Sequence, residues 1–426
     1  MKEKLRPGWP RRPRVRATLA VGMALAGLSG LALAQPSRAL ADPTETLVAV
    51  GADTTQDVFN QFALDAAGNL VGSYNATNPV TGAAHEIITP ADGSAGVNCS
   101  FARPNGSTEG VANLRLALNP ATTNGSPAVA PVAQQGCVDI ARSSSGPGTL
   151  QSNTGPIVYV PFALDAVAGA TGPATCTGTP NPCASYSYTY TNGTTQTVTA
   201  APVPTAITTA SDFTFADLQI LYDNCGTVTE GGIIYNPGTA TAGQVQIDLY
   251  IPQSGSGTRS FWASTLGFNN TTPPACVHDT IVGGSLAAAS PAVPVEQNNG
   301  TPVATDPNGY VPFSIAQWIA QRNGHDDRRH TAVLANLTPA GSTTPVSPFS
   351  NGNPATGSLN TNFPITRDVY NVVSYTRVTT TTDPLYSLLN GPSSFVCQDS
   401  LQIISYGFAL IPSTCGEVVA TLRAQG

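Results

Sequence analysis

Three stretches of the sequence place glycines and hydroxyl side chains directly before a helix-forming segment. They are GADTTQD (51–57), NGSTEGV (105–111) and SGSGTRS (254–260). The first turn of a helix exposes N–H groups without an intrahelical partner and carries the positive end of the helix dipole. Such a junction can therefore bind an anion. A fourth hydroxyl-rich loop, ARSSSG (141–146), adds one arginine.

Each junction also has a plainer interpretation. Serine and threonine are preferred helix caps everywhere, and a single arginine most often pairs with a surface carboxylate. The recurrence of one design at several junctions favours a shared site, in which neutral donors and one or two arginines surround an oxyanion. The candidate ligand-binding residues are Thr54, Thr55, Ser107, Thr108, Arg142, Ser143, Ser144, Ser256, Gly257, Thr258 and Arg259.

Alternating strands and helices must hold these junctions in place. Apolar or alternating runs predict strands at 47–50, 155–171, 246–252 and 366–378, and helical spacing predicts helices over 53–66, 214–224, 311–324 and 415–426. Asp53 or Thr54 is expected to cap the first of these helices and Thr214 the second, while Phe313 is expected on the buried face of the third. Residues 170–210 are typical of a β-hairpin or an ornamented loop. This alternation indicates an α/β protein.

Residues 1–41 have the pattern of a secretory signal peptide. A basic head precedes the apolar run ATLAVGMALAGLSGLALA (17–34), and Ala39-Leu40-Ala41 follows as a cleavage pattern. Without this segment the chain keeps ten basic residues, all arginine, and 24 acidic residues, a formal net charge of −14. We expect an exported protein of the extracellular space or cell envelope. No cysteine stands at the cleavage position, so we expect no lipid anchor there.

The eight cysteines, an even number in an exported chain, predict disulfides. They are Cys99, Cys137, Cys176, Cys183, Cys225, Cys276, Cys397 and Cys415. Spacing alone does not give the connectivity. Nearest-neighbour pairs such as Cys176–Cys183 and Cys397–Cys415 are the simplest hypothesis. No CxxC pair or spaced histidine cluster occurs, so we expect no metal site.

The order of these motifs carries a resemblance. GADTTQD, NGSTEGV, DIARSS (139–144), IVYVPFALDAV (157–167), TFADLQILYDN (214–224), GSGTRSFW (255–262), NGYVPFSIAQW (308–318) and FPITRDVYNVV (363–373) occur in an order similar to that of phosphate-binding proteins, the solute receptors of phosphate ABC importers. The resemblance covers about residues 45–420. It implies a two-lobe, type II periplasmic-binding-protein-like α/β fold, with mixed sheets flanked by helices and two hinge strands near 157–166 and 365–375. The implied lobes are 42–160 plus 365–426, and 161–364.

The resemblance also implies ligand residues, with two departures. Thr55, Ser107, Ser256, Gly257 and Thr258 stand at the family's positions. The arginine that usually precedes GSGT is absent, because Ile251, Pro252 and Gln253 stand there. Ser144 stands where the family has the aspartate that accepts the proton of hydrogen phosphate. Arg142 and Arg259 are the candidate replacements for the positive charge.

The resemblance favours a binding protein that captures phosphate or a related oxyanion for an ABC importer, as a monomer without a cofactor. We expect no enzymatic activity, because no GxSxG elbow and no lysine for Schiff-base or P-loop chemistry remain in the mature chain. A surface this acidic disfavours binding to nucleic acid. The rival hypothesis is a secreted or wall-associated structural or adhesive protein, in which the fold persists and the ligand site has decayed.

Overall fold

A computed structural model of the chain describes residues 46–66, 68, 70–79, 83–90, 99–119, 136–172 and 212–426, and the backbone of 186–189 and 195–198. The predicted signal peptide, Cys176 and Cys183 lie outside these ranges. In the part of the chain described, no helix combines the length and the apolar character that crossing a membrane requires.

A mixed, ten-stranded sheet runs through the described residues. Its order is β13 (Val277–His278), β12 (Asp248–Tyr250), β14 (Gly309–Ser314), β6 (Ile157–Thr171), β16 (Thr366–Ser374), β5 (Ile140–Ser143), β1 (Leu47–Gly51) and β2 (Val71–Ser73), while β15 (Val333–Leu334) and β17 (Arg423–Ala424) also pair with β6. Three smaller sheets join β11 (Gln244–Gln246), β10 (Ile233–Asn236) and β9 (Val228–Glu230); β3 (Ile87–Ile88) and β4 (Phe101–Ala102); and β7 (Tyr186–Thr189) and β8 (Thr195–Val198). The last pair confirms a hairpin within 170–210.

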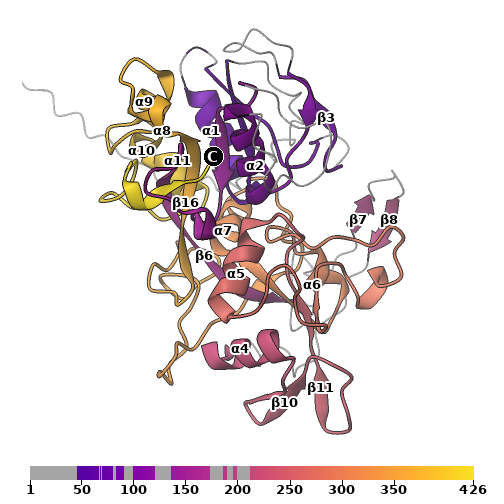
Figure 1. Cartoon of the computed structure of the whole chain (residues 1–426). Helices are drawn as coiled ribbons and strands as arrows, with labels where there is room; N and C mark the ends of the chain where they lie inside the picture. The colour runs from indigo at the N-terminus through magenta and orange to yellow at the C-terminus, as the bar shows by residue number, and fades with distance from the viewer. Residues whose placement is uncertain are drawn as a thin grey trace, which may run out of the picture. The chain divides into compact units, whose positions relative to one another are not determined.

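Two groups of parallel strands are joined through the two long strands of the main sheet. We call β5, β1 and β2 with their helices the first lobe, and β13, β12 and β14 with theirs the second lobe. The strand β6 runs antiparallel to β14 at one end and to β16 along its length, and β16 runs antiparallel to β5. In Figure 1 both long strands lie between α1 and α2 on one side and α5 and α6 on the other. The predicted two-lobe α/β fold with two crossing strands is confirmed, whereas the predicted residue limits of the lobes stay a prediction.

Ten short helices accompany the strands in the described part of the chain. They are α1 (Gln56–Asp65), α2 (Ser107–Leu118), α4 (Phe215–Asn224), α5 (Gly257–Leu266), α6 (Thr301–Thr305), α7 (Ile315–Arg322), α8 (Tyr375–Thr379), α9 (Pro384–Leu389), α10 (Phe395–Gln398) and α11 (Ser400–Ser405). Thr214 caps α4 as predicted, in a full capping box with Asp217.

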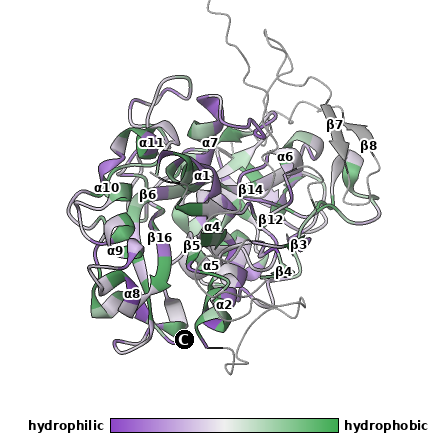
Figure 2. Ribbon diagram, turned by 90° about the horizontal axis from the view of Figure 1, so that it is seen from above, coloured by the Kyte–Doolittle hydropathy of each residue, from purple (hydrophilic) through white to green (hydrophobic). Residues whose placement is uncertain are grey.

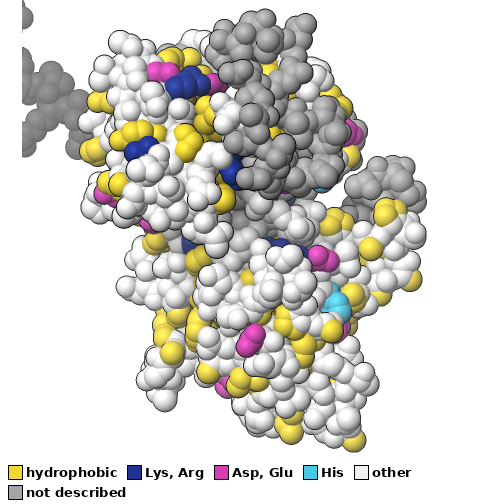
Figure 3. All heavy atoms as spheres, in the orientation of Figure 1, with side chains coloured by type: hydrophobic (Ala, Val, Ile, Leu, Met, Phe, Trp, Pro, Cys, Tyr) yellow, Lys and Arg dark blue, Asp and Glu magenta, His cyan; other side chains and the backbone are white. Residues whose placement is uncertain are grey.

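The apolar side chains of the strands and helices form the buried core. Val369, Val372 and Val373 of β16 are completely buried, and Figure 2 shows the green, hydrophobic colour on part of this strand. Charged groups are sparse on the face drawn in Figure 3, in keeping with a chain that is only 10% charged. Burial of apolar surface is therefore the main stabilising contribution.

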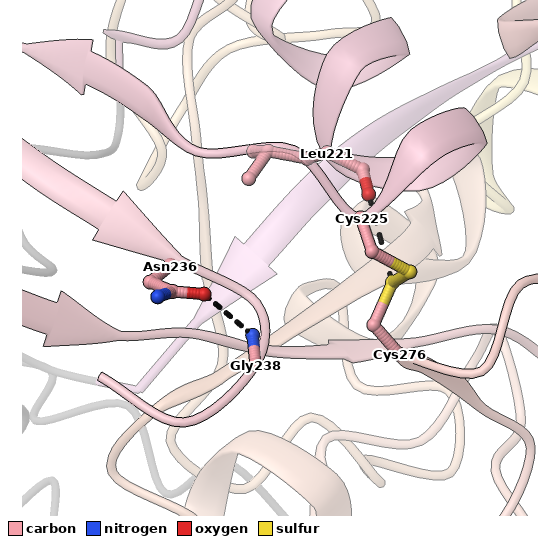
Figure 4. Close-up of a disulfide and its surroundings, with 5 residues drawn as sticks. All are labelled: Leu221, Cys225, Asn236, Gly238 and Cys276. Atoms are coloured by element: carbon pink, nitrogen blue, oxygen red, sulfur yellow. Dashed lines mark hydrogen bonds between the residues drawn. A yellow bond between two sulfur atoms is a disulfide. The ribbon is translucent and has the colours of Figure 1, made fainter. Parts of the chain in front are cut away.

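Three disulfides are described, and they tie loops to this core. They join Cys99 to Cys137, Cys225 to Cys276, and Cys397 to Cys415. The last confirms one of the two predicted nearest-neighbour pairs. Figure 4 shows how Cys225–Cys276 fastens the end of α4, near Leu221, to the segment before β13, beside the turn that Asn236 closes on the backbone N–H of Gly238 (2.8 Å).

Several local predictions were wrong. Phe313 lies in β14, because residues 309–314 form a strand and the helix begins only at Ile315. The strand predicted to reach residue 378 ends at Ser374, where that side chain caps α8. The closing segment holds a 3-10 turn (Ala420–Leu422) and β17 instead of an α-helix. Thr55, rather than Asp53 or Thr54, stands at the N-cap of α1, and its side chain makes no capping bond.

Close backbone approach fixes the position of α2 against the first lobe's sheet. A Cβ atom at Gly110, inside α2, would lie 2.6 Å from the Cα atom of Gly51, and Gly51 itself has φ +108°. Only glycine permits this approach. It brings the start of α2 beside the loop between β1 and α1.

We predict that Gly110→Ala destabilises the protein by about 1–3 kcal/mol, because overpacking two backbones costs more than the helix propensity of alanine gains. Urea denaturation monitored by circular dichroism measures the change. An exposed helical glycine would show the opposite sign, so a stabilised variant would contradict the packing described here.

Candidate functional site

The predicted hydroxyl junctions of the two lobes meet where strands end and helices begin. In the first lobe, β1 leads into Asp53–Thr55 and α1, and Gly106 leads into α2. In the second lobe, β12 leads through the loop 251–256 into α5. Loops at the carboxyl ends of parallel strands are the usual place for a ligand in α/β folds.

Hydroxyl groups from both lobes lie within hydrogen-bonding range of one another. Thr54 Oγ1 is 3.5 Å from Thr258 Oγ1, which bridges the lobes. Ser107 Oγ is 3.3 Å from Ser144 Oγ and accepts a bond from the Ser144 backbone N–H (3.1 Å). All four residues are at most 2% exposed. We call Thr54, Ser107, Ser144 and Thr258 the hydroxyl cluster.

Glycines allow the two lobes to come this close. A Cβ atom at Gly257 would lie 2.3 Å from Ser107 Oγ and 2.5 Å from Ser144 Oγ. One at Gly106, where φ is +108°, would lie 2.5 Å from the carbonyl oxygen of Gly255. The backbone N–H of Thr108 donates to that same carbonyl (3.1 Å). The first turns of α2 and α5 therefore touch through backbone as well as hydroxyl groups.

Two glutamines that the sequence did not single out complete the surroundings. Ser256 caps α5, accepting from the Arg259 N–H, and donates to Gln297 Oε1 (2.8 Å). Gln317 Nε2 donates to the carbonyl oxygen of Thr54 (2.6 Å). Within the described residues, Gln317 Oε1 is buried without a hydrogen-bond partner. Gln297 stands in none of the quoted motifs, and Gln317 stands in NGYVPFSIAQW, where its residue type and spacing do not mark it as a neighbour of the site.

Arg142 is held away from the hydroxyl cluster. The residue is completely buried, and burial lowers its pKa to about 9. Its guanidinium N–H groups donate to Ser73 Oγ and to the carbonyl oxygens of Ala49, Gly51, Ala52 and Tyr74 at 2.6–3.4 Å. This geometry makes Arg142 a support for the β1 loop rather than a ligand.

Arg259 is likewise engaged by its own lobe. Its Nη1 contacts Asp279 Oδ2 at 2.9 Å and donates to the Pro252 carbonyl oxygen (3.1 Å), while Nε and Nη2 donate to Asn270. The candidate charge replacements are therefore both committed elsewhere in this structure.

The remaining candidates, Ser143, Thr108 and Thr55, differ in burial and in hydrogen bonding. Ser143 Oγ donates to the Ser145 carbonyl oxygen (2.7 Å) and so closes its own loop. Thr108 is exposed. Thr55 is completely buried, and among the described residues its hydroxyl has no partner.

A pair of carboxyl groups from opposite lobes lies beside the hydroxyl cluster. Burial raises the pKa of Glu296 well above its usual value, and the neighbouring Asp53 raises it further, while Arg328 lowers it. Burial also raises the pKa of Asp53, against the opposing effects of Gln297 and Arg328. Arg328 itself reaches across to Asp57 of α1 (3.1 Å). The two acids therefore hold a proton more tightly in the folded chain than in the unfolded one.

A separate cavity of about 720 Å³ lies beside the starts of β12 and β14. Asp248, His278 and Asp306 line it, and no arginine is among its lining residues. Burial, with the charge of Asp248, raises the pKa of Asp306 to about 7. Two carboxyl groups make this cavity a poor place for an anion, so it does not compete with the hydroxyl cluster as an oxyanion site.

Comparisons with known proteins return structures but no sequence relatives. No protein-family model and no curated protein matches the chain. Solved structures that it resembles include a Clostridium perfringens protein assigned as a phosphate ABC transporter substrate-binding protein, with bound phosphate (11% identity, TM-score 0.42, covering 86% of this chain and 100% of that one). Others are a Planctomyces limnophilus protein described as a possible phosphate-binding protein (10%, 0.36, 87% and 94%) and a human phosphate-binding apolipoprotein (14%, 0.35, 87% and 92%).

These TM-scores are below 0.5, so the ligand must be argued from the chain's own residues. The strand order itself defines a two-lobe α/β protein whose lobes are joined by two long antiparallel strands. What this particular chain binds is a separate question.

The carboxyl pair predicts that stability falls as pH rises. The folded chain binds more protons than the unfolded chain at Asp53 and Glu296, so this contribution is full below about pH 4 and is lost as pH rises through the raised pKa values. We predict that Glu296→Gln raises the melting temperature at about pH 8 but changes it little at about pH 4.

Melting curves across this range measure the effect, with Glu230→Gln on β9 as the matched control. If wild type and Glu296→Gln lose stability equally with pH, the carboxyl pair is not as the structure has it.

Proposed function

We propose that the protein is an exported solute-binding protein, which captures a tetrahedral oxyanion between its lobes and presents it to an ABC importer. Phosphate is the first candidate. The observation that carries the proposal is the meeting of hydroxyls and helix N-termini from both lobes at Thr54, Ser107, Gly257 and Thr258.

The chemistry of these donors suits an anion. Hydroxyl and backbone N–H groups at helix N-termini donate to oxyanion oxygens without requiring a full positive charge nearby. A chain with a formal net charge of −14 after signal removal needs such local donors, because its overall field repels anions. Thr54, Thr55, Ser107, Ser144, Ser256, Gly257 and Thr258 are the proposed ligand set.

The positions of the donors support a mechanism in which the two lobes close on the ligand. The donors belong to different lobes, and the lobes are joined by two long strands. An anion that accepts hydrogen bonds from both sides would stabilise the closed arrangement, as hinge closure does in two-lobe receptors. The predicted signal sequence and the three described disulfides suit export.

One observation favours the rival proposal, a secreted structural or adhesive protein with a decayed site. Asp53 and Glu296 lie beside the hydroxyl cluster, and ionised carboxylates oppose a second anion. The protonated form of the pair removes this opposition. The two proposals therefore differ in whether any oxyanion binds near neutral pH.

We predict saturable binding of phosphate to the refolded, ligand-free mature chain. Calorimetry gives the affinity, and thermal shift gives a second readout, since ligand at about 100 times Kd adds about 2.7 kcal/mol of stability. Ser107→Ala and Thr258→Val should each weaken binding roughly 10-fold, the value of one or two lost hydrogen bonds.

Sulfate serves as the parallel titrant, and Ser350→Ala, far along the chain in an exposed turn, serves as the matched variant. Absence of heat and of stabilisation at millimolar phosphate and sulfate would sink the receptor proposal and leave the rival.

A further inference from the structure

The neutral donors of the proposed site would bind an anion more strongly beside a positive charge, which neither Arg142 nor Arg259 offers. Both guanidinium groups are committed to partners in their own lobe. An oxyanion in a protein of this acidity would gain most from one buried cation, because charge-assisted hydrogen bonds are roughly twice as strong as neutral ones.

Arg367 of β16 is a buried arginine with spare donors. The residue is 6% exposed, and its Nε and Nη2 donate to Asp165 Oδ2 at 3.2 and 2.8 Å. Its third nitrogen, Nη1, is buried without a hydrogen-bond partner among the described residues. Leaving a buried donor unpaired is unfavourable, and more so when the group is charged. The arrangement is therefore unfavourable unless another acceptor completes it.

Asp165 fixes this arginine in place. The carboxylate is completely buried in β6 and accepts from Ser314 Oγ (2.9 and 3.0 Å) and from the backbone N–H of Ala316 (3.1 Å). These bonds join both crossing strands to the first turn of α7. A buried ion pair contributes little net stability after its desolvation cost, so stability alone gives no reason for this pair.

Contacts on two sides connect Arg367 to the hydroxyl cluster. On one side, its guanidinium carbon lies 5.3 Å from the ring centre of Phe261, three residues after Thr258 in α5. On the other side, Ser314 accepts from the Gln317 N–H (3.2 Å), and Gln317 donates to the Thr54 carbonyl oxygen. Arg367 thus sits where the hinge strands meet the helices whose first turns carry Thr54's partners.

We propose that Arg367 is the cationic ligand of the oxyanion, donating through Nη1 while Asp165 orients it. This proposal rests on the proposed function. The positive charge then comes from a crossing strand instead of a helix junction. One residue would therefore contact both the ligand and the carboxylate of the other crossing strand.

The test compares variants of the mature chain by phosphate calorimetry. Arg367→Gln alone would leave the buried Asp165 carboxylate without its counter-ion. The informative variant is therefore Asp165→Asn with Arg367→Gln, which replaces the ion pair by two amides. We expect it to melt cooperatively and to bind phosphate roughly 10- to 100-fold more weakly than wild type. Arg367→Lys keeps the charge and should recover part of the loss.

A charge-matched control is Arg322→Gln at the end of α7, whose guanidinium holds the loop near Gly357. We expect its affinity to equal that of wild type. If the folded double variant binds like wild type, or if Arg322→Gln loses as much affinity as the double variant, Arg367 is not the ligand. A wild-type chain that binds no oxyanion overturns the proposed function as well, which separates the two failures.

Discussion

The pairing of β6 with β16 is the constraint on which the rest of the structure depends. Residues 157–160 of β6 pair with the end of β16 that also pairs with β5 of the first lobe, and residues 167–170 pair with β14 of the second lobe. The strand β16 thus reaches the first lobe, β6 reaches the second, and their pairing with each other joins the two lobes. The position of every loop that reaches the hydroxyl cluster is set by where these strands hold the two parallel groups.

The buried ion pair between Asp165 and Arg367 sits on this frame, at the end nearest the second lobe. The buried Arg367 is neutralised by its counter-ion Asp165. That carboxylate accepts from two guanidinium nitrogens and leaves the third, Nη1, without a partner among the described residues. The hydroxyl cluster supplies neutral hydrogen-bond donors to the site. The charge of the Asp53–Glu296 pair depends on pH, because burial raises the pKa of both carboxyl groups. Charge at this site is therefore balanced by local partners, not by the field of the whole protein.

The sequence predicted the elements with strong local signals and missed those set by tertiary contacts. The GSGTR junction, the Thr214 cap and the long β6 run carry their own signals and were found. Phe313 was assigned to a helix because a short apolar run fits either period. Arg142 stands beside three serines, and nothing local reveals that backbone carbonyls and Ser73 Oγ take all of its donors. Gln297, Gln317 and Arg367 reach the region of the site only through folding.

The most direct measurement is a crystal structure of the mature chain grown at neutral pH with millimolar arsenate, located by the anomalous scattering of arsenic. We predict one strong arsenic peak whose arsenate oxygens accept hydrogen bonds from Ser107, Thr258 and Arg367 Nη1, donors that come from both lobes and the crossing strand. An unchanged hydroxyl cluster with no arsenic peak beside it, at a concentration that saturates other oxyanion receptors, would contradict the account.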